Sequence, residues 1–373
     1  KSEKIAFSHD IIVPSFKPDT RQDTTWVDSL HIKSIDRVAY THFLPDDIVL
    51  RAFTESLTDR YFLKAERKDA NNFSLFFSYG DSIMPAVRGL NFDAENAFLI
   101  ESSLQQDTLT YWLRDTALVN QDTLQIELSY RMTDSTGVLV SRTDTLDVLA
   151  KESYAKRQKR LNKELEEWTK KQEKRKKKGE PYDSVMAPKP LEVKIGVASQ
   201  LDPDKNISFS FPTRRSSDLA DTAGIHLYAK HDTLWYRAPF EFEDMGNRNY
   251  KLRGEWRPDI EYSLEIDSAA FVDIYGLASK PVKQGFKVSS LDEYSTLLVN
   301  ITSLENEHLL VQLLNGQDQV VKETKAVNGV AEFYYLKPEK YYLRLIVDRN
   351  NNGKWDTGDY EKDQQAEEVY YYP

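Results

Sequence analysis

The sequence predicts a mainly β protein made of tandem β-sandwich modules with one long charged helical insertion. Apolar and polar residues alternate in several short runs, most clearly from Leu124 to Met132, which is typical of strands with one buried face. The length of 373 residues exceeds the roughly 100 residues of one sandwich, so two to four modules are expected. From Lys151 to Lys178 the chain contains helix formers and no Gly or Pro, which predicts the helix.

Composition excludes several classes of function. The net charge of -10 argues against a general nucleic-acid binder, which needs a broad basic surface. The absence of cysteine excludes disulfides, thiol nucleophiles, cysteine-based zinc sites and iron-sulfur clusters. No apolar run approaches the roughly 18 residues that span a bilayer. The first residues lack an initiator Met and a signal-peptide pattern, so we interpret the chain as a fragment of a longer protein.

The strand and turn signals divide the chain into segments. Residues 1–39 read as the tail of a missing upstream module and a linker, because Pro, Asp and Thr are frequent there. A first β-sandwich is expected over 40–150, the charged helix and a linker over 151–190, a second sandwich over 191–290 and a third over 291–373.

The predicted helix is strongly basic. Lys151 to Lys178 holds 13 basic and 5 acidic residues, a net charge of +8, which leaves -18 on the rest of the chain. Tyr154, Leu161, Leu165 and Trp168 form a thin apolar stripe at helical spacing. The basic run from Lys174 to Lys178 is read first as a solvated helix end, with contact to anionic lipid or nucleic acid as the alternative.

The segment Asp348 to Asp359 has the pattern of a calcium-binding loop. Oxygen-bearing side chains fall at loop positions one, three, five, nine and twelve, and Gly353 stands at position six, where the chain turns sharply. The candidate ligands are Asp348, Asn350, Asn352, the backbone carbonyl of Lys354, Asp356 and Asp359. Position twelve is Asp rather than the usual bidentate Glu, and the loop follows a strand. The alternative is an Asn-Gly turn whose side chains cap their own backbone. A bound calcium ion would be structural.

No catalytic constellation stands out. The six histidines, His9, His31, His42, His226, His231 and His308, show no close ligand spacing. Neither a Gly-x-Ser-x-Gly elbow nor a phosphate-binding glycine loop is present. The paired acids Asp46-Asp47 and Glu367-Glu368 sit among polar residues, so we interpret them as solvated surface. We therefore expect no enzyme.

The segment Ser210 to Leu219 resembles the translation of a common DNA-sequencing adapter, which suggests an assembly artefact. The alternative is an ordinary polar loop after the strand Ile207 to Phe211. On either interpretation Arg214, Arg215, Ser216 and Ser217 are not assigned to a phosphate site or to a nucleophile.

Two further patterns carry a family resemblance. Tyr262 to Asp267 followed by Asp273-Ile-Tyr275-Gly276 is an Ig-like strand-and-turn pattern, and Phe333 to Pro338 with Tyr341 to Leu345 looks like a carboxypeptidase-regulatory or transthyretin-like sandwich. The chain as a whole resembles Bacteroidota-type surface lipoproteins with a bacterial Ig-like domain of the SbsA type. The resemblance implies a location in the bacterial cell envelope, on the outer-membrane surface or its periplasmic face. It also implies attachment to the membrane only through an N-terminal lipid anchor upstream of Lys1.

The leading hypothesis for function is a non-enzymatic structural or interaction protein with a protein or glycan partner and no nucleic-acid partner. A carbohydrate-binding surface protein is the first alternative, because Trp112, Trp235, Trp256 and Trp355 could stack on sugar rings unless they are core or loop anchors. The second alternative is an enzyme, or the accessory domains of one.

Overall fold

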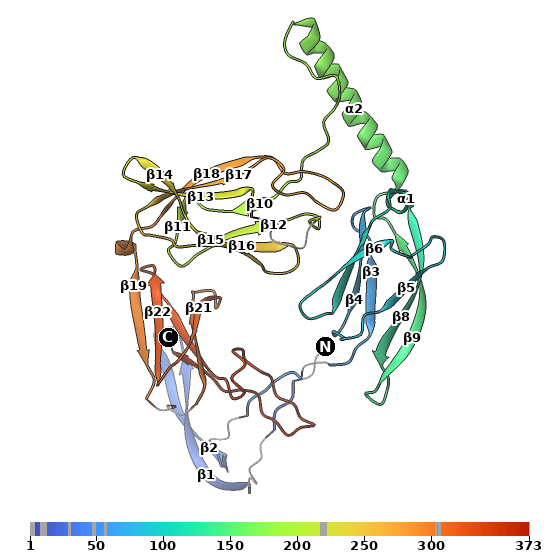
Figure 1. Ribbon diagram of the computed structural model, residues 1–373. Helices are drawn as coiled ribbons and strands as arrows, with labels where there is room; N and C mark the ends of the chain where they lie inside the picture. Colours follow the sequence, from blue (N-terminus) through green and yellow to red (C-terminus); the bar gives the residue numbers. More distant parts are fainter. Residues whose placement is uncertain are drawn as a thin grey trace. The chain divides into compact units, whose positions relative to one another are not determined.

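The computed structural model confirms a mainly β protein with several sandwich sheets and one long helix (Figure 1). It describes residues 4–7, 13–28, 31–46, 50–55, 58–216, 222–302, 304 and 307–372. The chain forms two compact units. Unit 1 comprises Lys1–Ser56, Thr296–Phe333 and Glu339–Pro373, and unit 2 comprises Leu57–Ser295 and Tyr334–Pro338.

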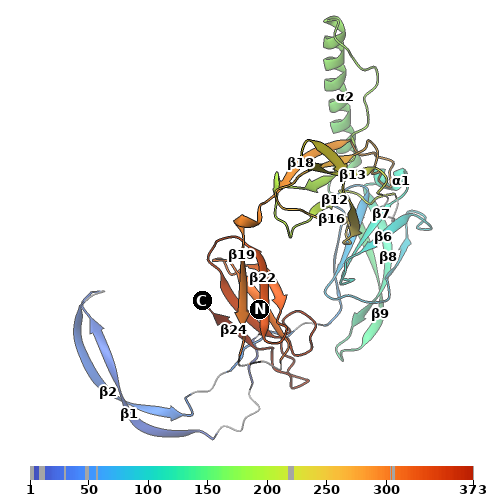
Figure 2. The ribbon, with the colours of Figure 1, turned by 60° about the vertical axis from the view of Figure 1, so that its left-hand side comes forward.

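Unit 1 begins with a long two-stranded ribbon. Strands β1 (Ser15–Trp26) and β2 (Ile32–Leu44) pair antiparallel along their whole length, and almost every side chain is exposed (Figure 2). The expected boundary between residues 39 and 40 falls inside β2, and the polar stretch read as a linker forms β1. The ribbon is held by backbone pairing without a buried face, so the apolar alternation that reveals other strands is weak here.

Two short segments on either side of this ribbon contact the third sandwich of the same unit. Ile5 and Phe53 exchange backbone hydrogen bonds of 2.8 Å. The ring of Phe53 lies so close to Gly358 that a Cβ there would come within 2.6 Å of it. The hydroxyl of Thr357 donates to the carbonyl of Thr54 over 2.7 Å. These contacts fasten residues 50–55 to the loop before the last strand.

The third sandwich contains a two-stranded sheet and a four-stranded sheet. The small sheet is β19 (Ser295–Asn300) with β22 (Val330–Leu336). The larger sheet has the order β21 (Val320–Lys325), β20 (Leu309–Leu314), β23 (Tyr342–Val347), β24 (Val369–Tyr372). Every residue of β20 is buried, including those whose side chains lie on the outer face of this sheet.

In unit 2, the first sandwich spans residues 62–149. One sheet has the order β3 (Phe62–Glu66), β4 (Asn72–Phe77), β7 (Thr108–Leu113), β6 (Phe98–Ser102). The other has the order β5 (Ala86–Gly89), β8 (Thr123–Thr133), β9 (Leu139–Leu149), and a short helix α1 (Thr116–Asn120) precedes β8. Leu124, Ile126 and Leu128 are fully buried, as their alternation predicts.

A buried charge cluster closes one end of this sandwich. Arg60 is almost fully buried over the ring of Phe77, with 4.1 Å between the guanidinium carbon and the ring centroid. Asp81 lies 3.8 Å from Arg60 Nε and accepts hydrogen bonds from Nε and Nη2 of Arg131, the first over 2.8 Å. The hydrogen bonds from Arg131 lower the pKa of Asp81 below its ordinary value of 3.8, and they outweigh burial, which acts in the opposite direction.

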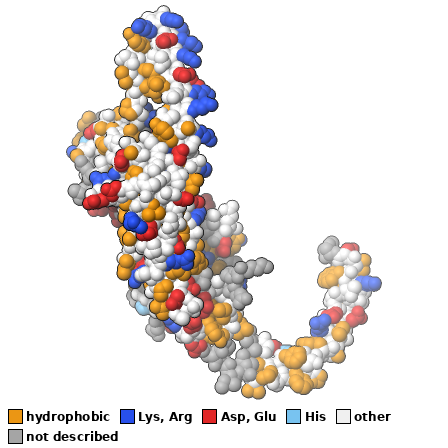
Figure 3. Space-filling view, turned by 90° about the vertical axis from the view of Figure 1, so that its right-hand side faces the viewer, with side chains coloured by type: hydrophobic (Ala, Val, Ile, Leu, Met, Phe, Trp, Pro, Cys, Tyr) orange, Lys and Arg blue, Asp and Glu red, His pale blue; other side chains and the backbone are white. Residues whose placement is uncertain are grey.

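The long helix α2 (Tyr154–Lys177) starts at Ser153, whose hydroxyl accepts from the N–H of Lys156. The chain that follows the helix runs back along it. Gln172 Oε1 accepts from the N–H of Asp183 over 3.1 Å, and Lys189 forms an ion pair with Glu164. Figure 3 shows Lys and Arg side chains along one edge of the helix. The lysines among residues 174–178 are exposed, as a solvated helix end requires.

The second sandwich spans residues 194–288. One sheet has the order β10 (Lys194–Gly196), β12 (Ile207–Ser210), β16 (Asn249–Gly254), β15 (Phe240–Asp244). The other has the order β11 (Gln200–Leu201), β18 (Val282–Val288), β17 (Glu261–Ile266), β13 (Ile225–His231), β14 (Leu234–Arg237), and a 3-10 turn (Leu291–Glu293) follows.

The residues of the Ig-like sequence pattern make hydrogen bonds that stabilise this sandwich. The hydroxyl of Tyr262 donates to the carbonyl of Glu255 and accepts from the N–H of Arg257, which resembles the tyrosine corner of Ig-like sandwiches. Asp273 is buried and its carboxylate accepts from the N–H groups of Tyr275 and Leu277. Tyr262 therefore holds its strand to the preceding loop, and Asp273 caps the turn that follows it.

The segment that resembles an adapter translation is packed into the second sandwich as far as residue 216. Phe211 is buried, and the guanidinium of Arg215 lies 5.1–5.5 Å from three ring centroids, those of Phe211, Tyr250 and Phe271. Residues 217–221 lie outside the described part. Among the described residues, no helix has the length and apolar composition needed to cross a membrane.

We predict that Asp81→Asn destabilises the first sandwich by about 3 kcal/mol near neutral pH, because it leaves buried Arg60 without its anionic neighbour. The native pKa of Asp81 is lowered, so its stabilisation is complete above the unfolded value near 3.8 and disappears as the pH falls through the lower native pKa. Scanning calorimetry from pH 3 to 7 should show the difference between native and variant shrinking at the acid end. Glu127→Gln, in the exposed pair with Arg88, is the matched control and should change little. A difference that is independent of pH would contradict the assignment.

Candidate functional site

The loop after β23 is closed by Asp348. This side chain is 1 % exposed, and its two carboxylate oxygens accept from the N–H groups of Asn352 over 2.9 Å and Gly353 over 2.7 Å. Gly353 has a φ of 79°, a conformation that glycine adopts without strain. The first and sixth positions of the expected calcium loop are therefore brought together as that pattern requires.

Three more of the predicted ligands converge beside Asp348. The side-chain amides of Asn350 and Asn352 each donate to Asp356 Oδ2 over 2.6 Å. Their amide oxygens accept from backbone N–H groups of the same loop, that of Asn350 from Asn352 and that of Asn352 from Lys354. The loop is thus satisfied by its own hydrogen bonds, which is the arrangement of a capped Asn-Gly turn.

The carboxylate at position twelve of the loop interacts with a nearby lysine. Asp359 accepts from the backbone and the ammonium group of Lys362, and these interactions lower the pKa of Asp359. Lys325 Nζ lies 2.7 Å from Asn351 Oδ1 and 4.0 Å from Asp348 Oδ2, so it places a cation beside the loop. Within the described ranges, no group of three His, Cys, Asp or Glu side chains is placed to hold a metal ion.

Glu367 is a site residue that the sequence interpretation missed. It is 5 % exposed, and its two carboxylate oxygens accept from the N–H groups of Arg349 and Asp356, each over 2.9 Å. The interpretation of Glu367 as solvated surface is therefore wrong, while its neighbour Glu368 forms an ion pair with Arg51. No local pattern marks Glu367, because its burial results from a loop eleven or more residues away folding over it.

A groove of about 510 Å³ lies between this loop and the outer face of the four-stranded sheet. One row of paired residues crosses all four strands: Glu323 on β21, Gln312 on β20, Arg344 on β23 and Tyr371 on β24. Gly353, Lys354 and Trp355 of the loop line the opposite side of the groove. Tyr371 also lines a second hollow, which continues along the sheet towards Tyr342 and Asn315.

The polar members of the row hold one another in place. Arg344 Nε donates to Gln312 Oε1 over 2.6 Å, and the amide of Gln312 donates to Glu323 Oε2. Within the described part of the chain, the two terminal nitrogens of Arg344 have no hydrogen-bond acceptor. Donors therefore remain available next to a fixed amide and a carboxylate.

The four candidate tryptophans separate into two pairs. Trp112 is 2 % exposed, donates to Glu101 and lies beneath the guanidinium of Arg248. Trp256 packs against the rings of Tyr262 and Phe286. Both are structural. Trp235 and Trp355 are 46 % and 43 % exposed, and Trp355 lies at a groove.

The indole of Trp355 is anchored at its polar end. Its Nε1 donates to the backbone carbonyl of Glu367 over 3.0 Å, which holds the ring beside the groove while leaving much of it accessible. Trp235 lies on β14 at the edge of its sheet, with the ammonium of Lys230 5.9 Å from its ring.

The histidines show no shared site among the described residues. His42 lies between Asp19 and Asp46, and hydrogen bonds to these two carboxylates, Asp19 first, raise the pKa of His42. His226 pairs with Asp267 at 3.0 Å, and His31 pairs with Asp28. His231 ends β13 before a turn, His308 lies next to β20, and His9 lies outside the described residues.

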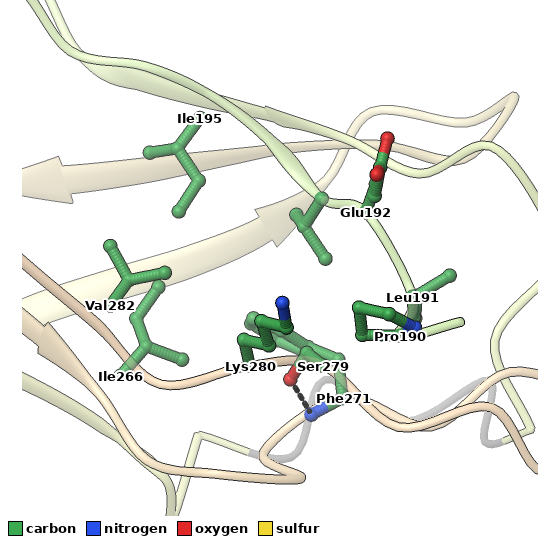
Figure 4. Close-up of a pocket in the computed structure, with 10 residues that line it drawn as sticks. Pro190, Leu191, Glu192, Ile195, Ile266, Phe271, Ser279, Lys280 and Val282 are labelled. Atoms are coloured by element: carbon green, nitrogen blue, oxygen red, sulfur yellow. Dashed lines mark hydrogen bonds between the residues drawn. The ribbon is translucent and has the colours of Figure 1, made fainter. Parts of the chain in front are cut away.

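A smaller hollow of about 220 Å³ lies at the margin of the second sandwich (Figure 4). Its lining is mostly aliphatic, with Leu191, Ile195, Ile266 and Val282. The hydroxyl of Ser279 is already used to accept from the N–H of Phe271. The two charged residues of its lining, Glu192 and Lys280, are both exposed, so the buried part of the wall offers few polar groups to orient a ligand.

Comparison with known proteins adds little to this geometry. No family model matches the chain, and no curated protein matches it. Among solved structures, the Bacillus anthracis TIE protein aligns at a TM-score of 0.15 and 11 % identity over 86 % of this chain, which spans 56 % of that protein. Extracellular cadherin domains 3–6 and 1–5 of protocadherin gamma B2 align at 0.15 and 0.16, with 10 % and 9 % identity, over 78 % and 93 % of this chain and 69 % and 74 % of theirs. At TM-scores this low the alignments do not identify a fold. The assignment of β-sandwiches therefore depends on the sheet topology of the structure itself.

We predict that Glu367→Gln destabilises the third sandwich by about 2–3 kcal/mol. The amide has one oxygen in place of two, so only one of the two loop N–H groups keeps its acceptor. Scanning calorimetry of the whole chain should show one transition moving down. Glu368→Gln removes the same charge one residue away, at a partly exposed ion pair with Arg51, and serves as the control. Equal shifts of the unfolding temperature for the two variants would contradict the conclusion that Glu367 holds the loop in place.

Calcium binding stays a prediction, because the groups that would bind the ion are engaged in hydrogen bonds. Calorimetric titration of the whole chain should give saturable binding with a dissociation constant of about 10⁻⁴ to 10⁻³ M, typical of extracellular calcium modules. Asp348→Asn and Asp356→Asn should abolish it. Asp359→Asn tests whether the twelfth position takes part. No heat at millimolar calcium would leave a turn closed by its own side chains.

Proposed function

We propose that this chain is a non-enzymatic interaction protein of a bacterial cell envelope, and that the groove on its third sandwich is the surface that binds a partner. The observation that carries the proposal is the cross-strand row of Glu323, Gln312, Arg344 and Tyr371 facing Trp355 across an open groove. Ligand sites combine apolar walls with a few placed polar groups, and this groove has both.

The sandwich interiors support a binding role at outer surfaces. The cores of the first and second sandwiches are closed clusters of buried apolar side chains, so a partner can reach only loops, outer faces and edges. The envelope location and the lipid anchor rest on the sequence resemblance to surface lipoproteins. The absence of an enzymatic activity rests on the lack of a recognisable catalytic constellation in the sequence.

The test uses the natural absence of cysteine, which lets a single introduced thiol be labelled uniquely. Lys354→Cys places a fluorophore at the groove, and Lys178→Cys places one at the exposed end of α2 as the control. Titration with an envelope extract of a Bacteroidota cell should give a saturable signal from the groove label only. Chromatography of the extract before and after incubation should show no converted component.

Two results would sink the proposal. A groove label that does not respond, or that responds no more than the control label, would mean that the groove is not the binding surface. Conversion of an extract component by the native chain would mean that the protein is an enzyme.

A further inference from the structure

We propose that the groove of the third sandwich binds a sugar ring of a glycan, stacked on Trp355 and Tyr371 and hydrogen-bonded to Arg344 and Glu323, which Gln312 holds in place. This inference rests on the proposed function, because it names the ligand class of the same groove. It commits to one chemistry, a pyranose ring that carries adjacent hydroxyl groups.

The aromatic side chains provide the apolar part of the site. The C–H face of a pyranose packs on an aromatic face, and an accessible ring held in one position suits this contact. Trp355 meets the requirement, since its Nε1 is tied to the carbonyl of Glu367 while 43 % of the residue remains exposed. Tyr371 is 63 % exposed at the end of the cross-strand row. Because the tryptophan is fixed before binding, little conformational entropy is lost when a ring stacks on it.

The row across the sheet provides the polar part. Adjacent sugar hydroxyls both donate and accept, so they need donors and acceptors side by side. Arg344 offers its terminal N–H groups, and Glu323 retains Oε1, to which no described residue donates. Gln312 is nearly buried and bonds to both, which fixes the spacing between donor and acceptor. A site built this way discriminates strongly against ligands that lack the hydroxyls.

Other ligand classes fit the groove less well. A peptide strand added to a sheet needs the free N–H and C=O groups of an edge, whereas the groove lies on the face of the sheet. A purely apolar ligand would remove the water that hydrogen-bonds to Arg344 and Glu323 and would offer no hydrogen bonds in its place. Nucleic acid is disfavoured by the net charge of -10.

The decisive experiment repeats the groove-label titration with extracts treated in two ways. Periodate cleaves bonds between carbons that carry adjacent hydroxyls, and proteinase K removes proteins. The expected result is a signal that periodate abolishes and that proteolysis leaves unchanged. A signal that survives periodate and is lost on proteolysis would overturn the glycan assignment but leave the interaction function standing. A signal absent from untreated extract would instead sink the proposed function.

Variants then locate the binding. The probes are purified hexasaccharides of β-glucose, α-glucose, xylose, mannose and galacturonic acid, measured by calorimetry on the whole chain. At least one should bind saturably, and Trp355→Ala and Arg344→Ala should each weaken it at least tenfold. Trp355→Phe keeps an aromatic ring but lacks the N–H that fixes it, so it should bind more tightly than Trp355→Ala and more weakly than the native chain, which separates stacking from misfolding of the loop. Trp235→Ala removes the other exposed tryptophan and should change nothing. Equal binding by native, Trp355→Ala and Arg344→Ala chains, or no binding to any probe after a periodate-insensitive signal, would overturn the proposal.

Discussion

The carboxylate of Glu367 is the constraint on which the third sandwich's outer surface depends. A buried charge is tolerated only when hydrogen bonds replace its hydration, and Glu367 obtains them from the backbone of the loop at Arg349 and Asp356. Its own carbonyl accepts from Trp355, so the same residue fixes the loop and the exposed ring. Without this anchor the loop would need another partner for two N–H groups, and the position of Trp355 would no longer be defined.

The groove exists because the loop covers only part of the sheet. Leu310 and Ile346, in the row next to Gln312 and Arg344, are buried although they lie on the outer face. Lys325, the β21 partner of Leu310, donates to Asn351 of the loop. Gly353, Lys354 and Trp355 of the same loop line the groove together with Arg344. The groove therefore lies between a buried apolar row, with Leu310 and Ile346, and a polar row, with Gln312 and Arg344. The polar row supplies the hydrogen-bonding groups. The sandwich core on the opposite face is not involved.

How much of this the sequence predicts depends on the range of the interaction. Alternation from Leu124 to Tyr130 locates β8 because each inward position is decided by its own strand and core. The loop at Asp348 is also local, since its first and sixth positions contact each other. The ribbon β1–β2 has no core to impose alternation, so its polar residues read as a linker. Glu367 and the row Glu323–Gln312–Arg344–Tyr371 depend on loop placement and on register across four strands, which one segment of sequence does not encode.

The tryptophans show the same division for function. In the sequence Trp112 stands between Tyr111 and Leu113, in an apolar run, whereas Trp355 stands between Lys354 and Asp356, in a polar segment. These contexts do not show how each indole is held. The difference comes from the partner of each indole N–H. Trp112 donates to a carboxylate that also binds Arg248, and the guanidinium of Arg248 lies over the ring, so the N–H and one face of Trp112 are covered by charged side chains of unit 2. Trp355 donates its indole N–H to the backbone carbonyl of Glu367, so the hydrogen-bonding requirement of the ring is met by the backbone. An indole satisfied in this way needs no further polar contact, so its accessible surface is suited to an apolar face of a ligand.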